Sequence, residues 1–290
     1  MTHHAHLLIV DPQNDFCDLP IAYQPSDPLN DGCVLTPQLP VPGAHADMLR
    51  LARLIRHGID AIAGITMTLD SHHHIGIERP DFWLQRDGGP VAPFTRLSSE
   101  DVRGGKFLPR NGAAKDKVLA YLDALEAAGR HIHTIWPVHC EIGTWGHNVH
   151  ADVLAACNAW ERHHCRPVMK VLKGGNPYTE HYSAIMAEVP DPADAGTQLN
   201  RQLLESLASA QVLLVAGEAG SHCVKATMEH YAHYAGPDAT ARIVLLTDCM
   251  SPIPGFETAY AAFLADMQRH GARLSTARAW LDGQAPVFRR

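Results

Sequence analysis

The sequence lacks the features that would assign the protein to a membrane or to nucleic acid. No apolar run approaches the roughly 20 residues that a membrane-spanning helix needs. The charged fraction is 19% and the formal net charge is -7, which indicates no basic surface for nucleic acid. The first residues show no basic region followed by a long apolar stretch, so they resemble a first strand more than a signal peptide. We therefore expect a cytoplasmic protein.

Closely paired cysteines are also missing. The seven cysteines are an odd number, and no CxxC pair occurs among them. In a reducing compartment such cysteines are expected to be free thiols, and a tetrathiolate zinc site is not indicated. There is no internal repeat either. What the chain does have is 290 residues of which 46% are hydrophobic, enough for a large buried core.

Short apolar runs alternate with amphipathic stretches along most of the chain. The runs are rich in Val, Ile or Leu and predict strands at 6–11, 61–69, 131–136, 168–173, 212–217 and 243–248. The stretches between them predict helices near 44–57, 147–161, 199–209, 222–234 and 256–270. Such apolar strands suit a sheet covered on both faces. The pattern predicts one domain over 1–290, a three-layer α/β/α fold with a mainly parallel, six-stranded, Rossmann-like sheet.

Two stretches interrupt this alternation. The segment 17–42 is rich in proline and is expected to be an irregular loop. The segment near 79–112 is rich in Gly and Pro and contains Phe82, Trp83 and Phe94. Long irregular loops often border binding sites, but a surface excursion packed by its own aromatic residues is an equally good interpretation.

Polar residues gather at the ends of the predicted strands. In an open parallel sheet, ligands bind beyond the carboxyl ends of the strands. Those ends carry Asp11, Asp70, Trp136 with His139 and Cys140 just beyond, Lys173, and the turn that leads to Cys223. If the sheet is correct, an acid, a group of metal ligands, a lysine and a cysteine meet at one edge.

Cys223 follows a strand and a turn containing Gly217, Ala219 and Gly220, and it begins a helix. A helix N-terminus presents free N–H groups and a partial positive charge, which lower the pKa of a thiol. The thiolate would be a nucleophile, and the same N–H groups could hold an oxyanion. The alternative is a small buried cysteine that only packs.

Asp70 and His72 lie at i and i+2, so in an extended segment their side chains point the same way. His139 could reach them from the neighbouring strand end. One carboxylate and two imidazoles leave positions open for water or substrate, as a catalytic metal ion requires. The alternative is a solvated histidine run. Similarly, Lys173 and Asp11 each close an apolar strand, and they form either a catalytic pair or a structural ion pair.

Taken in order, these segments resemble the nicotinamidase/isochorismatase-like cysteine hydrolases over residues 6–276. The matching segments are Asp11-Pro-Gln-Asn-Asp-Phe-Cys17, Asp70-Ser-His72, Trp136-Pro-Val-His139-Cys140, Lys173-Gly174 with Tyr182-Ser-Ala184, and Gly217 to Val224. Loop insertions then fall near 18–42, 80–130 and 187–198. The resemblance implies the isochorismatase-like hydrolase fold.

The resemblance also implies roles for individual residues. Cys223, Asp11 and Lys173 would form a catalytic triad, with the backbone N–H groups of Ala219 and Cys223 as the oxyanion site. Phe16, Trp136 and Tyr182 would line the substrate pocket, the first two as walls around a flat ring. Asp70, His72 and His139 would hold one divalent metal ion, which could be Zn, Fe or Mn because all three suit mixed nitrogen and oxygen ligands. His74 is a further candidate near the metal.

Some residues depart from the family's pattern. Gly220 and Ser221 stand where the family often has aspartate or threonine. Glu218 stands where an aliphatic residue is usual, next to the cis peptide expected before Ala219. A charge at this position could change substrate preference or contact another subunit.

The function implied is hydrolysis of a small heteroaromatic carboxamide, foremost nicotinamide to nicotinate and ammonia through a Cys223 thioester, which would belong to NAD metabolism. The alternatives are a related amidase acting on a carbamoyl or ureido compound, and a non-catalytic metabolite-binding protein on the same fold. The partner is a small-molecule amide, with self-association into a homo-oligomer possible in such families.

Overall fold

The computed structural model describes residues 5–284 and contains a central parallel sheet. Its strands run in the order β5-β2-β1-β6-β7-β8, and every neighbouring pair is parallel. The six strands are β1 (Ala5–Val10), β2 (Ile62–Asp70), β5 (Met169–Lys173), β6 (Val212–Gly217), β7 (Ile243–Leu246) and β8 (Arg273–Ser275). The predicted six-stranded parallel sheet is confirmed.

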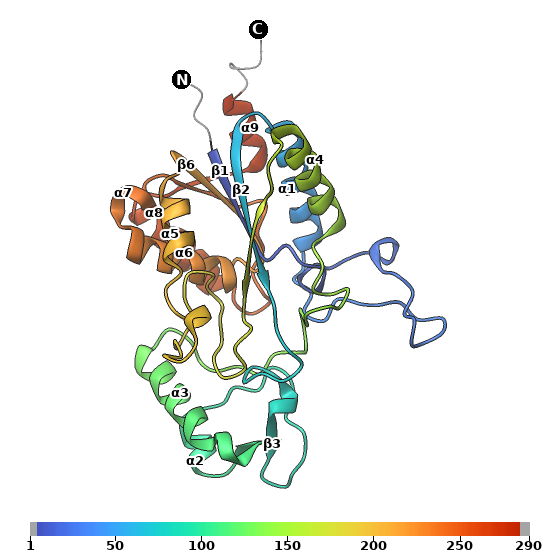
Figure 1. The fold of residues 1–290 in the computed structure, drawn as a ribbon, viewed down its shortest axis with the longest axis vertical. Helices are drawn as coiled ribbons and strands as arrows, with labels where there is room; N and C mark the ends of the chain where they lie inside the picture. Colours follow the sequence, from blue (N-terminus) through green and yellow to red (C-terminus); the bar gives the residue numbers. More distant parts are fainter. Residues whose placement is uncertain (1–4, 285–290) are drawn as a thin grey trace.

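Helices cover both faces of this sheet, as Figure 1 shows. On one side lie α1 (Ala44–His57), α4 (Ala151–His164) and α9 (Ala277–Gln284). On the other side lie α5 (Arg201–Ala208), α6 (Cys223–Ala235), α7 (Pro237–Thr240) and α8 (Glu257–Arg269). The buried apolar residues of both layers and of the sheet form one continuous core. The three-layer α/β/α prediction is therefore confirmed.

One predicted strand is wrong. The segment 131–136 is not in the sheet, and the sixth strand is β8 instead. Its backbone pairs with the preceding insertion, since Leu97 N donates to His133 O and Ile135 N donates to Thr95 O. Ile135 is fully buried in a second apolar cluster. Ile135 is thus covered by a neighbouring insertion, which periodicity alone cannot distinguish from burial in a sheet, while Ile132 is 60% exposed.

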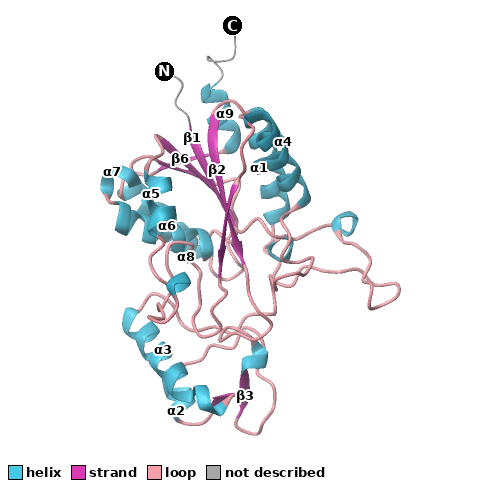
Figure 2. Cartoon of the chain, viewed as in Figure 1, coloured by secondary structure: helices cyan, strands magenta, loops and turns pink. Residues whose placement is uncertain are grey.

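That second cluster belongs to a structured excursion spanning roughly 77–135, drawn at the bottom of Figure 2. It contains β3 (Trp83–Gln85) paired antiparallel with β4 (Phe107–Pro109), and the helices α2 (Ser99–Arg103) and α3 (Lys115–Ala128). Trp83 is fully buried and Phe82 nearly so. The interpretation of 79–112 as an excursion packed by its own aromatic residues is confirmed for Phe82 and Trp83, but Phe94 is 59% exposed.

The proline-rich segment 17–42 is irregular, as predicted. It projects from the body of the molecule beside α1 and carries a single short 3-10 turn, Ile21–Tyr23, in its outer part. Ile21 and Leu29 are 69% and 88% exposed. The segment returns to the body at Leu39, which is buried.

The strand register brings the candidate residues to one level. Asp70 of β2 is paired with Lys173 of β5, and Val10 of β1 is paired with Gly217 of β6. Asp11 follows Val10 directly. Because neighbouring strands end together, three side chains and the turn after β6 meet at the carboxyl edge of the sheet. Within the described residues, no helix has the length and apolar character needed to span a membrane.

Candidate active site

The turn between β6 and α6 carries Cys223. Gly217 has a φ of 120°, and a Cβ there would lie 1.9 Å from Val10 O, so only glycine fits against β1. The peptide between Glu218 and Ala219 is cis, as expected. No backbone hydrogen bond of the described residues engages the N–H of Ala219, which is buried and lines a pocket. This donor is free to meet a ligand.

Cys223 is 6% exposed and sits at the first position of α6. Its Sγ lies 3.6 Å from Lys173 Nζ. Burial raises the pKa of the Cys223 thiol well above its ordinary value, and Asp11 and Asp70 raise it further, while Lys173 acts in the opposite direction. The expectation of a lowered thiol pKa at a helix N-terminus was wrong, because it left out desolvation. The resting residue is a thiol that needs a base.

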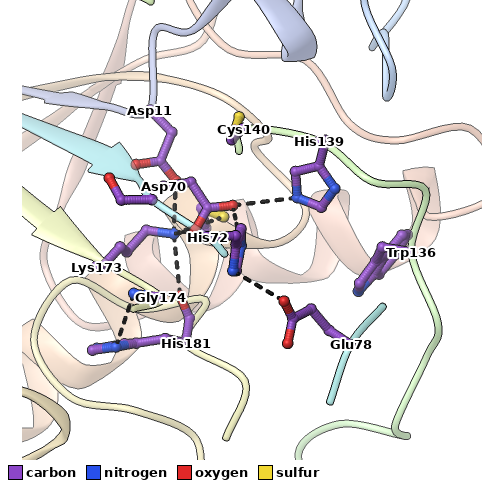
Figure 3. A network of polar contacts seen from close by, with 12 residues as sticks. Asp11, Asp70, His72, Glu78, Trp136, His139, Cys140, Lys173, Gly174 and His181 are labelled. Atoms are coloured by element: carbon purple, nitrogen blue, oxygen red, sulfur yellow. Dashed lines mark hydrogen bonds and ion pairs between the residues drawn. The ribbon is translucent and has the colours of Figure 1, made fainter. Parts of the chain in front are cut away.

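Asp11 and Lys173 form a buried charge network with Asp70, seen in Figure 3. Lys173 Nζ lies 2.9 Å from Asp11 Oδ2 and 2.9 Å from Asp70 Oδ1, and it donates to His181 O at 3.1 Å. Although burial alone would lower it, these two carboxylates raise the pKa of Lys173 well above its usual value. Burial raises the pKa of Asp11, against the effect of Lys173. Asp11 is therefore a better proton acceptor than an exposed aspartate.

Asp70, His72 and His139 converge as predicted. One ligand atom of each lies within 4.8 Å of the others, and all three residues are buried. Asp70 Oδ2 is 2.8 Å from His72 Nε2 and 3.3 Å from His139 Nε2. A Cβ at Gly174, whose φ is 87°, would lie 2.9 Å from His72 Cε1, so the backbone leaves this space open. The mixed carboxylate and imidazole donors fit a divalent metal ion.

A buried ion pair between Glu78 and Arg79 contacts both His72 and His139. Glu78 Oε1 lies 3.1 Å from His72 Nδ1 and 2.9 Å from Arg79 Nε. Arg79, fully buried, places Nη1 at 3.1 Å from His139 Nδ1 and donates from Nη2 to His139 O at 2.6 Å. His139 Nδ1 also lies 2.7 Å from Pro137 O, which leaves Nε2 directed at Asp70. The sequence reasoning missed both charged residues.

The two histidines have opposite charge environments. For His72, the carboxylates of Asp70 and Glu78 overcome the effect of burial and raise the pKa to about 10. For His139, burial and the neighbouring Arg79 lower the pKa to about 4. At neutral pH one imidazole is therefore charged and the other neutral.

The predicted aromatic residues line one pocket beside Cys223. Its walls comprise Phe16, Leu39, Asp70, Trp136, His139, Glu180, His181, Tyr182, Ala219, His222, Cys223 and Ile253. Trp136 Nε1 donates to Tyr182 OH at 2.9 Å, which fixes both rings. The cavity between these walls is about 20 Å³, room for one water molecule. Side chains must move before a ring can enter.

Other candidates lie outside the pocket. His74 is exposed and pairs with Glu141 and Asp81, so it is not part of the metal cluster. Glu218 is fully buried behind the turn and does not face the pocket. Its predicted effects on substrate choice or subunit contact are not supported by this placement. The seven cysteines all lie within the described residues and are free thiols, as expected.

Sequence reasoning also missed the residues that hold the predicted ones. Gln13 exchanges two hydrogen bonds with the backbone of Asp70, at 2.7 and 2.8 Å. Thr68 Oγ1 donates to Asp11 Oδ1 at 2.5 Å. Gln13 lies in a segment on which the resemblance rests, but the sequence did not predict its hydrogen bonds to Asp70. Glu78 and Arg79 had no such signal, because they lie at the start of the excursion.

Comparison with solved structures places this geometry on a known fold. No family model and no curated protein sequence matches the chain. The yeast nicotinamidase bound to the inhibitor nicotinaldehyde is similar with a TM-score of 0.60 at 19% identity, covering 94% of this chain and 99% of that one. The chain has the nicotinamidase fold. An Acinetobacter baumanii nicotinamidase/pyrazinamidase has a TM-score of 0.56 at 17% identity, covering 96% and 98%. The pyrazinamidase of Pyrococcus horikoshii in complex with zinc has a TM-score of 0.50 at 18% identity, covering 94% and 99%.

Proposed function

We propose that the protein is a metal-containing cysteine amidohydrolase that converts a small heteroaromatic carboxamide, foremost nicotinamide, into the acid and ammonia. The observation that carries this proposal is the buried group of Cys223, Lys173 and Asp11 beside the aromatic pocket. A structural ion pair would need neither the adjacent thiol nor the free N–H of Ala219. The fold shared with nicotinamidases supports the same conclusion. We further propose that the whole chain is one hydrolase domain, with insertions near 18–42, 80–130 and 187–198.

The chemistry begins with the thiol. Asp11 takes the proton of Cys223, and Lys173, 3.6 Å from the sulfur, stabilises the thiolate. The sulfur attacks the carboxamide carbon, and the N–H groups of Ala219 and Cys223 receive the developing oxyanion. Asp11 returns the proton to the departing nitrogen, and ammonia leaves a thioester on Cys223. Water, deprotonated by Asp11, then hydrolyses the thioester.

Asp70, His72 and His139 would hold the divalent ion, with Glu78 and Arg79 fixing the two imidazoles. When bound, the ion would supply a Lewis acid that orients the substrate, for instance through a pyridine nitrogen, or that positions a water molecule. Because the donors combine one carboxylate with two imidazoles, Zn, Fe and Mn are all suitable. His72 must lose its proton for metal binding, so binding should be weaker at low pH.

The test is ammonia release from nicotinamide by the purified, metal-loaded protein, with Cys223→Ala as the control. Rapid release that is lost in the variant would support both the substrate and the nucleophile. Substantial release by Cys223→Ala, with the variant folded, would contradict the nucleophile. Folding is checked separately by thermal unfolding, since replacing one small buried side chain should change stability little.

A second substrate class is favoured by the size of the cavity. A space of about 20 Å³ needs less rearrangement for a carbamoyl or ureido compound than for a pyridine ring. Release of ammonia from such a compound, with none from nicotinamide and with the same dependence on Cys223, would select this alternative. Saturable binding of an amide without any turnover would instead indicate a metabolite-binding protein.

A further inference from the structure

Glu218 is a buried acid that the proposed chemistry does not use. It is fully buried, directly before Ala219 and five residues before Cys223. Its Oε2 accepts a hydrogen bond from Ser251 N at 3.1 Å, and its Oε1 has no hydrogen-bond partner. An uncompensated buried carboxylate is costly, so its protonation state must be explained by its neighbours.

Ser251 connects Glu218 to a second buried acid, Asp47 in the first turn of α1, because its N–H reaches Glu218 Oε2 and its hydroxyl reaches Asp47 Oδ2. Asp47 has the partners of an ionised carboxylate: Arg50 pairs with Oδ1, and Ser251 Oγ donates to Oδ2 at 2.6 Å. Among the described residues, no cation pairs with Glu218. Burial and the adjacent Asp47 raise the pKa of Glu218 well above 4.5. Two adjacent buried carboxyls are stable when one of them keeps a proton, which then forms a hydrogen bond between them.

Charged and titratable groups on other elements also affect the pKa of Glu218. Asp18, at the start of the projecting segment, adds negative charge near Glu218. The Cys17 thiol and Tyr260 of α8 lie in the same region, and burial raises the pKa of both, so both are neutral. Arg50 is the cation of this cluster, and it is engaged by Asp47 and by Asp248 O. Burial, Asp47 and Asp18 thus favour a neutral Glu218 and outweigh the opposing hydrogen bond from Ser251 N.

Ser251 links this pair to the turn that carries Ala219. Ser251 N donates to Glu218, Ser251 Oγ donates to Asp47, and Ser251 O accepts from Gly220 N at 2.8 Å. Two residues later, Ile253 N bonds to Ser221 Oγ at 3.0 Å. Hydrogen bonds from the loop that contains Ser251 and Ile253 thus hold the turn on both sides of Ala219.

We infer that Glu218 is a positioning residue: as a neutral carboxylic acid it donates its proton to Asp47, accepts the N–H of Ser251, and so holds the turn that presents the Ala219 N–H to the oxyanion. The role at the oxyanion rests on the proposed function. The linkage from Asp47 through Glu218 and Ser251 to the turn, which we call the clamp, does not rest on the proposed function, because it concerns only the folded chain. Ionised Glu218 would repel Asp47 and loosen the turn.

Two variants separate the parts of this inference. Glu218→Gln keeps a donor toward Asp47 and an acceptor for Ser251 but cannot ionise. Glu218→Leu restores an apolar side chain without either bond. Glu205→Gln, the same chemical change on an exposed residue of α5, is the matched control.

The first measurement is thermal unfolding as a function of pH. A carboxyl whose folded pKa lies above its unfolded value contributes stability at pH below about 4.5, and this stability is lost as the pH rises toward the folded pKa. The Tm of the unmodified protein should therefore fall by about 3 °C more per pH unit than the Tm of Glu218→Gln, from about pH 5 up to the folded pKa of Glu218. Glu205→Gln should follow the unmodified protein. Parallel curves for Glu218→Gln and the unmodified protein would overturn the shared proton.

The second measurement is amide hydrogen exchange of the peptide containing 218–223, which needs no substrate. Exchange there should be faster in Glu218→Leu and unchanged in Glu218→Gln, with the α5 peptide unchanged in both. In the active enzyme, Glu218→Leu should lower kcat by about 10- to 100-fold with little change in KM, because the oxyanion contact is made in the transition state. Glu218→Gln should keep kcat.

Unchanged exchange in Glu218→Leu would overturn the clamp, and full kcat in that variant would overturn its role at the oxyanion. If the unmodified protein released no ammonia from any amide, the proposed function would fail, while unfolding and exchange would still decide the clamp.

Discussion

The two halves of the site are built differently. Asp11, Asp70 and Lys173 stand at the ends of sheet strands, where neighbouring strands fix their positions, and Cys223 begins α6 after the turn that follows β6. Trp136 and His139 arrive on a loop that follows the excursion and is held by the buried Glu78–Arg79 pair. The strand-end half contains the groups that would form and break bonds. The loop half provides a metal ligand and a pocket wall, so it can vary without disturbing the nucleophile.

The largest expected effect lies in the strand-end half. Replacing Asp11 with Asn keeps the hydrogen bond from Thr68 but removes the proton acceptor for Cys223. We expect kcat for ammonia release to fall by about 10²- to 10⁴-fold. Metal content should be unchanged, because Asp11 is not a ligand. Asp60→Asn, on an exposed residue, is the control. A variant that keeps its activity would assign the base elsewhere.

The same contrast explains what could be predicted from the sequence. Strand ends were identifiable because buried parallel strands are continuous apolar runs, and this placed Asp11, Asp70 and Lys173 together. The segment 131–136 also contains Ile132, Ile135 and Trp136, yet Ile135 packs into the cluster of the excursion. Glu78 and Arg79 were not predicted because their pairing depends on how the excursion folds back. The raised pKa of Cys223 was missed because desolvation depends on burial by segments distant in the sequence.

The next effect tests the loop half. Arg79→Met removes one of the two charged partners of the buried Glu78, leaving His72, and it removes the donors to His139. We expect the free energy of unfolding to drop by about 3–5 kcal/mol and the affinity for Zn²⁺ to fall by about 10- to 100-fold.

Arg110→Met is the matched control, since Arg110 is exposed and its ion pair with Asp81 spans 3.8 Å. Affinity is measured by competition with a chelator at a temperature where the variant is folded. Zn²⁺ binding as tight as in the unmodified protein would show that the loop holds His139 without Arg79.

A smaller effect compares the two histidines directly. His72 has a pKa of about 10 and His139 of about 4, so only His72 carries a proton at pH 7. Binding of Zn²⁺ to the metal-free protein should therefore release about one proton from these residues, and affinity should rise about tenfold per pH unit between pH 7 and 9. Calorimetry in two buffers of different ionisation enthalpy counts the protons. Release of none, or of two, would contradict the opposite charge environments.

The smallest expected effect concerns the outer edge of the loop half. Phe94 is 59% exposed and packs edge-on against Trp136, with 6.0 Å between the ring centres. Replacing it with Ser removes an aromatic contact of about 0.5–1.5 kcal/mol, which should lower kcat/KM for nicotinamide by about 2- to 10-fold through a looser Trp136. Leu29→Ser, at an even more exposed position on the projecting segment, should leave kcat/KM unchanged. Because Phe94 does not touch Cys223 or the metal ligands, the loss should appear mainly in KM. A loss in kcat alone would mean that Trp136 also orients the bound amide for attack by Cys223. The loop half would then take part in the chemical step together with the strand-end half.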